Sequence, residues 1–259
     1  MPRPKVIAVI PARMASSRFP GKPLVPILGV PMVEHVRRRA LLADGVDEGV
    51  VATCDTSIFE AVTRAGGRAV MTADTHERCT DRVEEAMRSL TGDIVLIVQG
   101  DEPLLQPGVL PRVAAPLLDR DDVVCTNLLS PLESDDDFAN PNIVKAVCAR
   151  NADVLFLTRA AVPFFRRRVE CPVFRQTGIM ALRADFLRAY ATLPETPFER
   201  AEAIDMLRVL EHGYRIAGVT VDFSTVGVDR PEDVPVVERL LQSDPEQRAL
   251  YERTRESAR

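Results

Sequence analysis

The sequence lacks the features that mark membrane and secreted proteins. No apolar run reaches the roughly 18–20 residues that a membrane-spanning helix needs. The first apolar run, residues 6–10, ends at Pro11, too early to form the core of a signal peptide. We therefore predict a cytoplasmic protein without a membrane partner. The five cysteines are widely spaced and include no C-x-x-C pair, which argues against a disulfide framework and against a structural zinc site.

Lysine is scarce, and the chain has no excess of positive charge. The formal net charge is −5, so no overall basic field indicates a nucleic-acid partner. Of 33 cationic residues only three are lysines, namely Lys5, Lys22 and Lys145. Such an arginine bias is typical of a GC-rich genome. It makes each lysine stand out, and two of the three lie in the motifs described below.

The glycine-rich fingerprint of dinucleotide-binding folds is also missing after the first apolar run, which argues against a dehydrogenase. The N-terminal half instead alternates short apolar runs, typical of buried parallel strands, with segments of helical spacing. The expected strands are 6–10, 49–53, 69–72 and 93–98, and the expected helices are 31–43 and 57–65. This alternation predicts an open α/β fold with a mostly parallel sheet.

The pattern becomes less regular after about residue 123. An acidic loop is expected at 133–137, and one charged helix is expected over 231–259. The other expected elements are strands at 123–126, 142–147 and 215–221 and a helix at 198–210. The phenylalanines of this part would lie in its core or at an interface, and the core is the more common place for such residues. They are Phe156, Phe164, Phe165 and Phe174.

The loop that follows the first strand is the strongest functional feature. Residues 11–22 contain no aspartate or glutamate. Three cations and several small residues lie among them: Arg13, Arg18, Lys22, Ser16, Ser17 and Gly21. Ligands of open α/β sheets bind at the carboxyl ends of the strands, where backbone N–H groups and guanidinium groups hold phosphate oxygens. The loop is therefore expected to bind a polyphosphate; a solvated basic loop is the alternative.

Two aspartates follow apolar strands that are far apart in the chain. Asp101 comes just after the strand 93–98, and Asp229 follows a late strand. A single aspartate at such a position is most often a turn or helix-capping residue. Two carboxylates that met at the phosphate-binding edge could instead hold Mg²⁺, which takes one or two carboxylates and completes its coordination with water and phosphate oxygens.

Several motifs of the chain resemble those of one enzyme family. Residues 11–24 read P-A-R-x-x-S-x-R-x-P-G-K-P-L, and shorter motifs are Q-G-D-E-P at 99–103, N-P-N-x-V-K at 140–145 and G-V-D-x-P-E-D at 227–233. Together they resemble the CMP-KDO synthetases (3-deoxy-manno-octulosonate cytidylyltransferases), which join CMP to an acidic sugar. The resemblance covers about residues 5–240. It implies a Rossmann-like open sheet of the nucleotide-diphospho-sugar transferase type, CTP, Mg²⁺ and a homodimer.

The resemblance also implies the organisation of the chain and the roles of individual residues. The whole chain, 1–259, would form one nucleotidyltransferase domain, in which about residues 128–215 contribute an inserted acceptor-binding and dimerisation part. The implied nucleotide-binding residues are Ala12, Arg13, Ser17, Lys22, Thr80, Arg82 and Gln99. The implied catalytic residues are Arg13, Lys22 and Asp101, and the implied metal ligands are Asp101 and Asp229. The implied acceptor-binding residues are Arg159, Arg175, Gln176, Glu202 and Asp205.

The reaction that the resemblance implies is the attack of an acceptor oxygen on the α-phosphorus of CTP, with pyrophosphate as the leaving group. Arg13 and Lys22 would neutralise the triphosphate. One Mg²⁺ on Asp101 and Asp229 would bind the α-phosphate and the attacking oxygen. Because such chemistry consists mostly of positioning and charge stabilisation, no side-chain general base is required.

The chain departs from the pattern of the family mainly on the acceptor side. Where the family reads R-H-x-G-I-Y-x-Y, residues 175–182 read R-Q-T-G-I-M-A-L, and L-E-Q-L-R becomes I-D-M-L-R at 204–208. In the family these positions contact the sugar, and a site built to hydrogen-bond hydroxyl groups discriminates through them. The changed residues on the acceptor side are Gln176, Met180, Leu182, Asp205 and Met206. On the nucleotide side, Arg78 and Cys79 replace the usual Ser-Gly.

Because these changes cluster, the main hypothesis is a smaller acidic acceptor such as the phosphonate phosphonoformate, which some relatives of the family join to CMP. Arginines suit phosphonate and carboxylate groups by bidentate pairing, and the segment contains Arg159, Arg166, Arg167 and Arg175. The alternative is a CMP-KDO synthetase in which the changes are neutral. Two further alternatives are a non-catalytic CTP-binding protein, disfavoured by the retained aspartates, and a sugar-phosphate nucleotidyltransferase, disfavoured by the form of the basic loop.

Overall fold

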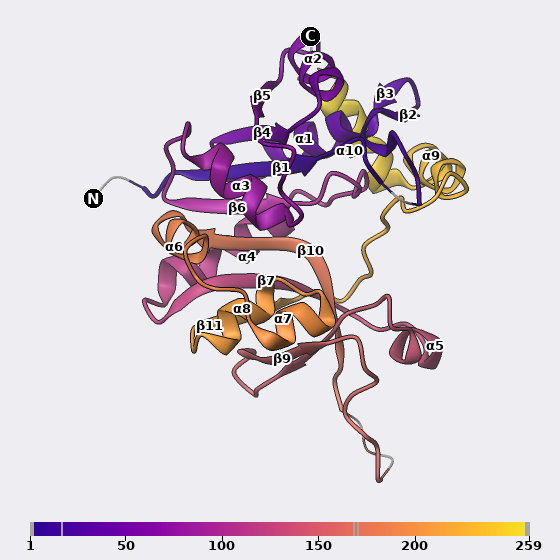
Figure 1. The fold of residues 1–259 in the computed structure, drawn as a ribbon. Coiled ribbons are helices and arrows are strands. Elements are labelled where there is room, and N and C mark those ends of the chain that lie inside the picture. The colour runs from indigo at the N-terminus through magenta and orange to yellow at the C-terminus, as the bar shows by residue number, and fades with distance from the viewer. Residues whose placement is uncertain (1–2, 17, 168, 170, 257–259) are drawn as a thin grey trace. The chain divides into compact units, whose positions relative to one another are not determined.

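The chain divides into two compact units (Figure 1). Unit 1 consists of Met1–Pro111 and Thr225–Arg259, and unit 2, which is inserted between them in the chain, consists of Arg112–Ser224. The computed structural model describes residues 3–16, 18–167, 169 and 171–256. That residues 128–215 bind the acceptor and form a dimer interface stays a prediction.

Unit 1 is built on parallel strands. β1 (Val6–Ala12) pairs with both β6 (Ile94–Val98) and β4 (Glu48–Thr53), and β4 pairs with β5 (Arg68–Met71); all three pairings are parallel. Every residue of β1 and β6 is buried, as expected for strands that are covered on both faces. The predicted α/β fold with a mostly parallel sheet is thereby confirmed.

Three helices connect these strands. α1 (Met32–Leu41) and α2 (Thr56–Arg64) lie where helices were predicted, and α3 (Cys79–Met87) precedes β6 without having been predicted. α1 buries one apolar face through Met32, Val36 and Ala40, which recur at helical spacing. A fourth helix, α4 (Val109–Asp119), follows β6 in the chain.

The prediction that Pro11 ends the first strand is wrong. β1 continues through Pro11 to Ala12, and both residues remain in register with β4. The pairing of β1 with β6 extends only to Val9. Pro11 therefore lies where the strand is paired on one side, a place in which a missing N–H is tolerated. The consequence is that Arg13, not Pro11, is the first residue beyond the strand.

The C-terminal segment of unit 1 also differs from the prediction. Instead of one helix it forms α9 (Asp233–Ser243) and α10 (Pro245–Glu256). Asp244 between them has extended backbone angles, because the proline that follows excludes the helical conformation. α9 packs beside the short hairpin of β2 (Pro26–Ile27) and β3 (Val30–Pro31), and its Val237 and Leu241 lie in one buried cluster with Ile27.

The strands of unit 2 pair in both parallel and antiparallel directions. β7 (Val123–Pro131) pairs in parallel with β11 (Arg215–Thr220) and antiparallel with β10 (Phe174–Arg183). β8 (Lys145–Cys148) pairs antiparallel with β10 and with β9 (Val154–Thr158). The helix α6 (Ala184–Tyr190) follows β10 directly.

Two local predictions for unit 2 are wrong. The acidic segment contains a short helix, α5 (Asp135–Ala139), because the Ser134 side chain accepts a hydrogen bond from Asp137 N and the acidic residues lie in the first turn. The single helix expected at 198–210 is two helices, α7 (Pro197–Glu202) and α8 (Met206–Glu211). Ala203 ends α7 with a left-handed backbone (φ 52°), a conformation that alanine rarely adopts.

The phenylalanines and cysteines of the chain lie in different surroundings. Phe164 and Phe165 are 89% and 40% exposed, so for these two the expectation of a core position is wrong. All five cysteines are free thiols, of which Cys125 is buried and Cys171 is exposed. Among the described residues, no helix is both long and apolar enough to cross a membrane.

Candidate active site

The candidate site of unit 1 lies at the carboxyl ends of β1 and β6. Because these strands are parallel neighbours, the segments that follow them leave the sheet at the same edge. Arg13 is the first residue after β1, and Gln99 is the first after β6. Asp101 follows two residues later, so residues from two distant parts of the sequence share this edge.

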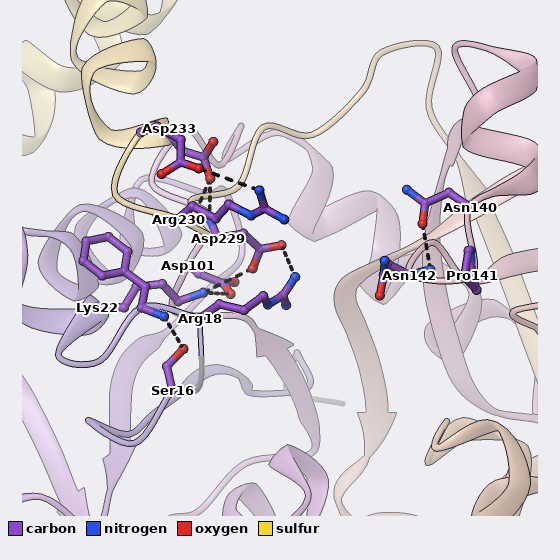
Figure 2. A network of polar contacts seen from close by, with 12 residues as sticks. Ser16, Arg18, Lys22, Asp101, Asn140, Pro141, Asn142, Asp229, Arg230 and Asp233 are labelled. Carbon is purple, nitrogen blue, oxygen red and sulfur yellow. Dashed lines mark hydrogen bonds and ion pairs between the residues drawn. The ribbon is translucent and has the colours of Figure 1, made fainter.

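A network of charged side chains joins the basic loop to both aspartates (Figure 2). Lys22 Nζ lies 2.6 Å from Asp101 Oδ2 and 3.6 Å from Asp229 Oδ1. Arg18 Nη1 lies 3.1 Å from Asp229 Oδ2. The Lys22 side chain is only 12% exposed, whereas that of Asp229 is 52% exposed. Two carboxylates that the sequence places 128 residues apart (229 − 101) therefore share one ammonium group.

Backbone hydrogen bonds hold the two aspartates in place. Val228 N donates to Asp101 O at 2.9 Å, which ties the segment before Asp229 to the segment after β6. The Asp233 carboxylate accepts hydrogen bonds from the backbone N–H groups of Asp229 and Arg230, both at 2.8 Å, at the beginning of α9 (Figure 2). The carboxylate of Asp229 is thus presented on a fixed turn rather than on a free loop.

The position of Lys22 follows from the turn that precedes it. Gly21 has a positive φ of 77° and donates its N–H to Met14 O at 3.0 Å, and η1 (Lys22–Leu24) begins directly after it. A β-carbon at this φ would be strained, so glycine is the residue suited to the turn. Asp55, at the end of β4, accepts a hydrogen bond from Met14 N at 2.8 Å and anchors the other side of the loop.

Two adjacent hollows lie over this edge of unit 1. One, of about 180 Å³, is smaller than the other, of about 370 Å³. Their walls share Pro11, Ala12, Arg13 and Gln99. The smaller hollow is completed by residues near the start of α3, among them His76, Arg78, Cys79 and Arg82, and the larger one by the basic loop with Asp101.

The wall of the smaller hollow is held by hydrogen bonds. Arg82 is buried and donates through Nη1 to Thr72 Oγ1 at 2.6 Å and to Ala73 O at 3.2 Å. Gln99 Nε2 donates to Cys79 Sγ at 3.3 Å. Thr80 is fully buried in the first turn of α3. These contacts keep α3 and its preceding loop against the end of β6.

His76, in the same wall, contacts the carboxylate of Glu85 through Nε2. A hydrogen bond from Ala73 N and the contact with His76 hold the pKa of the Glu85 carboxyl below its usual value.

The structure thus brings together most of the residues predicted for the nucleotide and the metal. Ala12, Arg13, Lys22, Gln99 and Asp101 line the larger hollow. Arg82 lines the smaller one, and Asp229 joins through the charge network. Ser17 lies outside the described residues.

The sequence reasoning missed His76, Asp55 and Asp233. His76 lies shortly before Thr80 and Arg82, which the family resemblance marks as nucleotide-binding residues. Asp233 belongs to the G-V-D-x-P-E-D motif itself. Asp55 lies two residues beyond the predicted strand 49–53, and no role was predicted for it.

The residues predicted to bind the acceptor lie in unit 2. Arg159 and Glu202 contact each other: Arg159 N donates to Glu202 Oε2 at 2.8 Å, and Arg159 Nε donates to Glu202 O at 2.7 Å. The other carboxylate oxygen of Glu202 accepts from Thr158 Oγ1 at 2.6 Å. Both side chains are therefore engaged in holding the chain together.

Arg175 and Gln176 are half-buried neighbours on β10. The half-buried Asp205 precedes α8, and its carbonyl accepts a hydrogen bond from the Tyr190 hydroxyl at 3.1 Å.

Three of the departures on the acceptor side, Met180, Leu182 and Met206, lie in the core of unit 2. Met206 is fully buried, with its sulfur 3.7 Å from Cys125 Sγ, and Met180 is 4% exposed. A side chain enclosed in this way does not reach an acceptor in solution. These two methionines are core residues here, which removes part of the basis for a changed acceptor.

The carboxylates of the site suit a hard cation that is shared with a ligand. Among the described residues, no group of three or more histidine, cysteine, aspartate or glutamate side chains is arranged to hold a metal ion. Asp101 and Asp229 form a pair, and a pair of carboxylates is what Mg²⁺ uses when phosphate oxygens and water supply its other ligands. The donor set therefore fits Mg²⁺ bound together with a nucleotide.

Comparison with known proteins defines the class first. A family model described as cytidylyltransferase matches residues 7–216, so the chain is a nucleotidyltransferase enzyme of the cytidylyltransferase type. Its fold is similar to that of 4-diphosphocytidyl-2C-methyl-D-erythritol synthase, with a TM-score of 0.62 at 17% identity over 93% of this chain and 100% of that one. At that identity the likeness shows the fold alone.

More similar proteins narrow the class. A protein of Geobacter metallireducens named 3-deoxy-manno-octulosonate cytidylyltransferase is 43% identical over 91% of this chain and 98% of its own length. One of Solibacter usitatus with the same name is 39% identical over 94% and 96%. A solved CMP:2-keto-3-deoxy-manno-octonic acid synthetase complexed with CTP matches with a TM-score of 0.88 at 37% identity, over 93% of this chain and 99% of that one. The chain belongs to the CMP-KDO synthetase family.

Proposed function

We propose that the protein transfers CMP from CTP to 3-deoxy-manno-octulosonate (KDO) and releases pyrophosphate. The observation that carries the proposal is the shared charge network of Lys22, Asp101 and Asp229 beside the two hollows of unit 1. Relatives named for KDO that are about 40% identical over nearly the whole chain favour this acceptor over phosphonoformate.

The larger hollow suits the triphosphate of CTP. Arg13 and Lys22 both line it and carry positive charge toward the ligand. An ammonium group has three N–H donors, so Lys22 can contact a phosphate oxygen while it remains close to the carboxylates. Arg18 lines the same hollow and adds a third cation. Cations fixed before the reaction stabilise the charge that develops on the leaving pyrophosphate.

Asp101 and Asp229 would hold the Mg²⁺ ion. When bound, this ion supplies positive charge at the α-phosphate and at the attacking oxygen. The chain itself contributes orientation: the bonds of Val228 to Asp101 and of Asp233 to Asp229 keep the two carboxylates in place. Positioning of this kind is the main contribution of a protein to phosphoryl transfer.

The smaller hollow would hold the cytidine part. Its wall contains hydrogen-bonding groups from Gln99, Arg78 and Cys79. The contact between Gln99 and Cys79 would hold the amide group of Gln99 beside the base. On the acceptor side, Arg175 would pair with the carboxylate of the acceptor, as guanidinium groups do in bidentate geometry.

Phosphonoformate remains a second candidate because of Gln176. This residue is half-buried on β10, and it stands where the family has histidine. Unlike Met180 and Met206, it is not enclosed in the core, so its replacement can change the contacts to an acceptor.

Pyrophosphate release from CTP and Mg²⁺ with KDO or phosphonoformate tests the proposal. We expect pyrophosphate release with KDO and none with phosphonoformate. The variant Asp101→Asn is the control and should be inactive with both acids. Release with phosphonoformate alone would refute KDO as the acceptor and restore the main hypothesis from the sequence. Binding of CTP without release with either acid would favour a non-catalytic CTP-binding protein.

We also propose that the protein is a homodimer. Phe164, Phe165 and Val169 lie together on the surface of unit 2, where they line a shallow hollow and are 89%, 40% and 62% exposed. Exposed apolar groups of this kind mark sites of association. Sedimentation equilibrium of the wild type and of Phe164→Ser is the test: we expect a dimer that the substitution weakens, and a monomeric wild type would refute the proposal.

A further inference from the structure

A buried ammonium group lies in unit 2. Lys145 is fully buried at the start of β8. Its Nζ donates to three backbone carbonyls, those of Asn140, Ile143 and Arg159, each at 2.8 Å. An ammonium group has three N–H donors, and here all three are used on the main chain.

Such a group is costly for stability. Burial disfavours the charged form and holds the pKa of Lys145 below its usual value, and the nearby Arg159 acts in the same direction. The three hydrogen bonds go to carbonyl oxygens rather than to a carboxylate. An apolar side chain here would leave these three carbonyl oxygens without a donor. The ammonium group therefore fixes the geometry of the segments whose carbonyl groups it binds.

Arg159 extends this geometry to two more segments. Its Nη1 donates to Pro141 O at 3.1 Å, and its Nε donates to Glu202 O at 2.7 Å. Lys145 in turn holds the carbonyl of Arg159. The two cations thus join three pieces of chain: the turn 140–143, the end of β9 and the end of α7.

The same lysine is also in register with the strand that carries the remaining acceptor candidates. Lys145 pairs with Arg175 of β10 and with Thr158 of β9. The next residue of β10, Gln176, donates its N–H to Val144 O at 2.9 Å. The turn 140–143, whose Pro141 and Asn142 are exposed, is therefore fixed beside Arg175 and Gln176.

We propose that Lys145 is a positioning residue for the acceptor: it fixes the turn 140–143 and the main chain of Arg159 beside Arg175 and Gln176. The acceptor contacts then come from Arg175, Gln176 and the exposed turn, while Arg159 and Glu202 act through the chain segments that they hold. This inference rests on the proposed function, because it requires that unit 2 binds the acceptor.

The test is Lys145→Met, which keeps an unbranched apolar stem and removes the ammonium group. We expect KM for the acceptor to rise about tenfold or more, with the Kd for CTP changed less than about twofold. The backbone amides of Asn142 and Ile143 donate hydrogen bonds to Asn140 at 2.9 and 3.2 Å. In Lys145→Met these amides should exchange with deuterium about tenfold faster than in the wild type. Lys145→Gln, which retains two N–H donors, should lie between Lys145→Met and the wild type.

Lys5→Met is the matched control, because Lys5 is 40% exposed and pairs with Glu48 in unit 1. It should leave KM for the acceptor and the exchange of the turn unchanged. An unchanged KM for the acceptor in Lys145→Met, or a rise in this KM that is matched by an equal rise in the Kd for CTP, would overturn the proposal. If neither Lys145 variant folds, the exchange rates of the wild type are compared instead. Slower exchange of the amides of residues 142–143 than of the exposed segment 133–136 supports the proposal, and equal rates overturn it.

The exchange measurement needs no acceptor, and KM is measured with whichever acid the wild type uses. A wild type that uses phosphonoformate would therefore refute KDO as the acceptor and still allow the role of Lys145 to be judged.

Discussion

Replacing Lys22 by methionine tests the central charge network of the site. The substitution removes an ammonium group that lies 2.6 Å from Asp101 and 3.6 Å from Asp229, and it keeps most of the apolar stem. Of the two cations paired with these carboxylates, Arg18 would remain. The local charge of the four side chains then changes from zero to −1, next to the place where a triphosphate must bind.

The size of the effect follows from the kind of contact that is lost. A hydrogen bond to a charged group contributes roughly 1.5–3 kcal/mol, which corresponds to roughly 10- to 150-fold in the Kd for CTP. The loss in kcat should be larger, about 10²–10³, if Lys22 also stabilises the leaving pyrophosphate as a fixed donor does. The free energy of unfolding should change by less than about 1 kcal/mol, because the Asp101 side chain is 34% exposed and water can solvate it.

Isothermal titration with CTP, in the presence and absence of Mg²⁺, measures the first effect, and pyrophosphate release measures the second. Lys5→Met is the control, since it removes an equal charge from an exposed ion pair with Glu48. A Kd for CTP in Lys22→Met within about twofold of the wild type would refute the assignment of Lys22 to the triphosphate.

Other positions give independent expectations. Glu199→Gln breaks a buried pair in which the Arg208 guanidinium donates at 2.8 and 2.6 Å, and urea unfolding should show a loss of about 3–5 kcal/mol. Burial lowers the pKa of His35 to about 4, so the unfolded chain binds a proton that the folded chain does not. The free energy of unfolding should therefore fall by about 3 kcal/mol as the pH drops from 6.5 to 4, a slope that His35→Gln should lack. Asp101→Asn should abolish Mg²⁺-dependent turnover while CTP binding without Mg²⁺ persists, as measured by titration. Met206→Gln should lower the free energy of unfolding by about 1–3 kcal/mol without changing KM for the acceptor, because it buries an amide in the core.

Much of unit 1 could be predicted from the sequence because its strands are buried on both faces. Val6–Ala12 and Ile94–Val98 are short runs of β-branched and other apolar residues, and their alternation with helices leaves few other folds. Among the predicted strands of unit 1, the end of β1 was misplaced, since whether a proline ends a strand depends on which of its sides is paired.

Unit 2 was predicted less well because its breaks depend on tertiary contacts. The break between α7 and α8 lies at Ala203, a residue with high helix propensity in a left-handed conformation. The surrounding contacts, among them the bonds of Arg159 to Glu202, fix the end of α7. No local signal in the sequence indicates such a break. By contrast, the break before Pro245 carries a local signal, the proline itself.

The gathering of charged residues at one edge of unit 1 could be predicted, because the motifs place them at the ends of adjacent parallel strands. The acceptor side could not. A motif shows which residue occupies a position, and it does not show whether the side chain faces a ligand or the chain itself. Arg159 and Glu202 illustrate the difference, since their charged groups are held by each other's segments and by Thr158.

Fewer positions therefore support a changed acceptor than the sequence indicated. Met206 and Met180 are enclosed in the core of unit 2, and a methionine there can accompany a change in packing without any change of substrate. If Met206→Gln destabilises the fold and leaves KM unchanged, the methionine belongs to the core and only Gln176 and Asp205 remain to separate KDO from a phosphonate. If the same substitution improves the use of KDO without loss of stability, position 206 reaches the acceptor. The changes from the family pattern would then have to be explained together as an altered acceptor site.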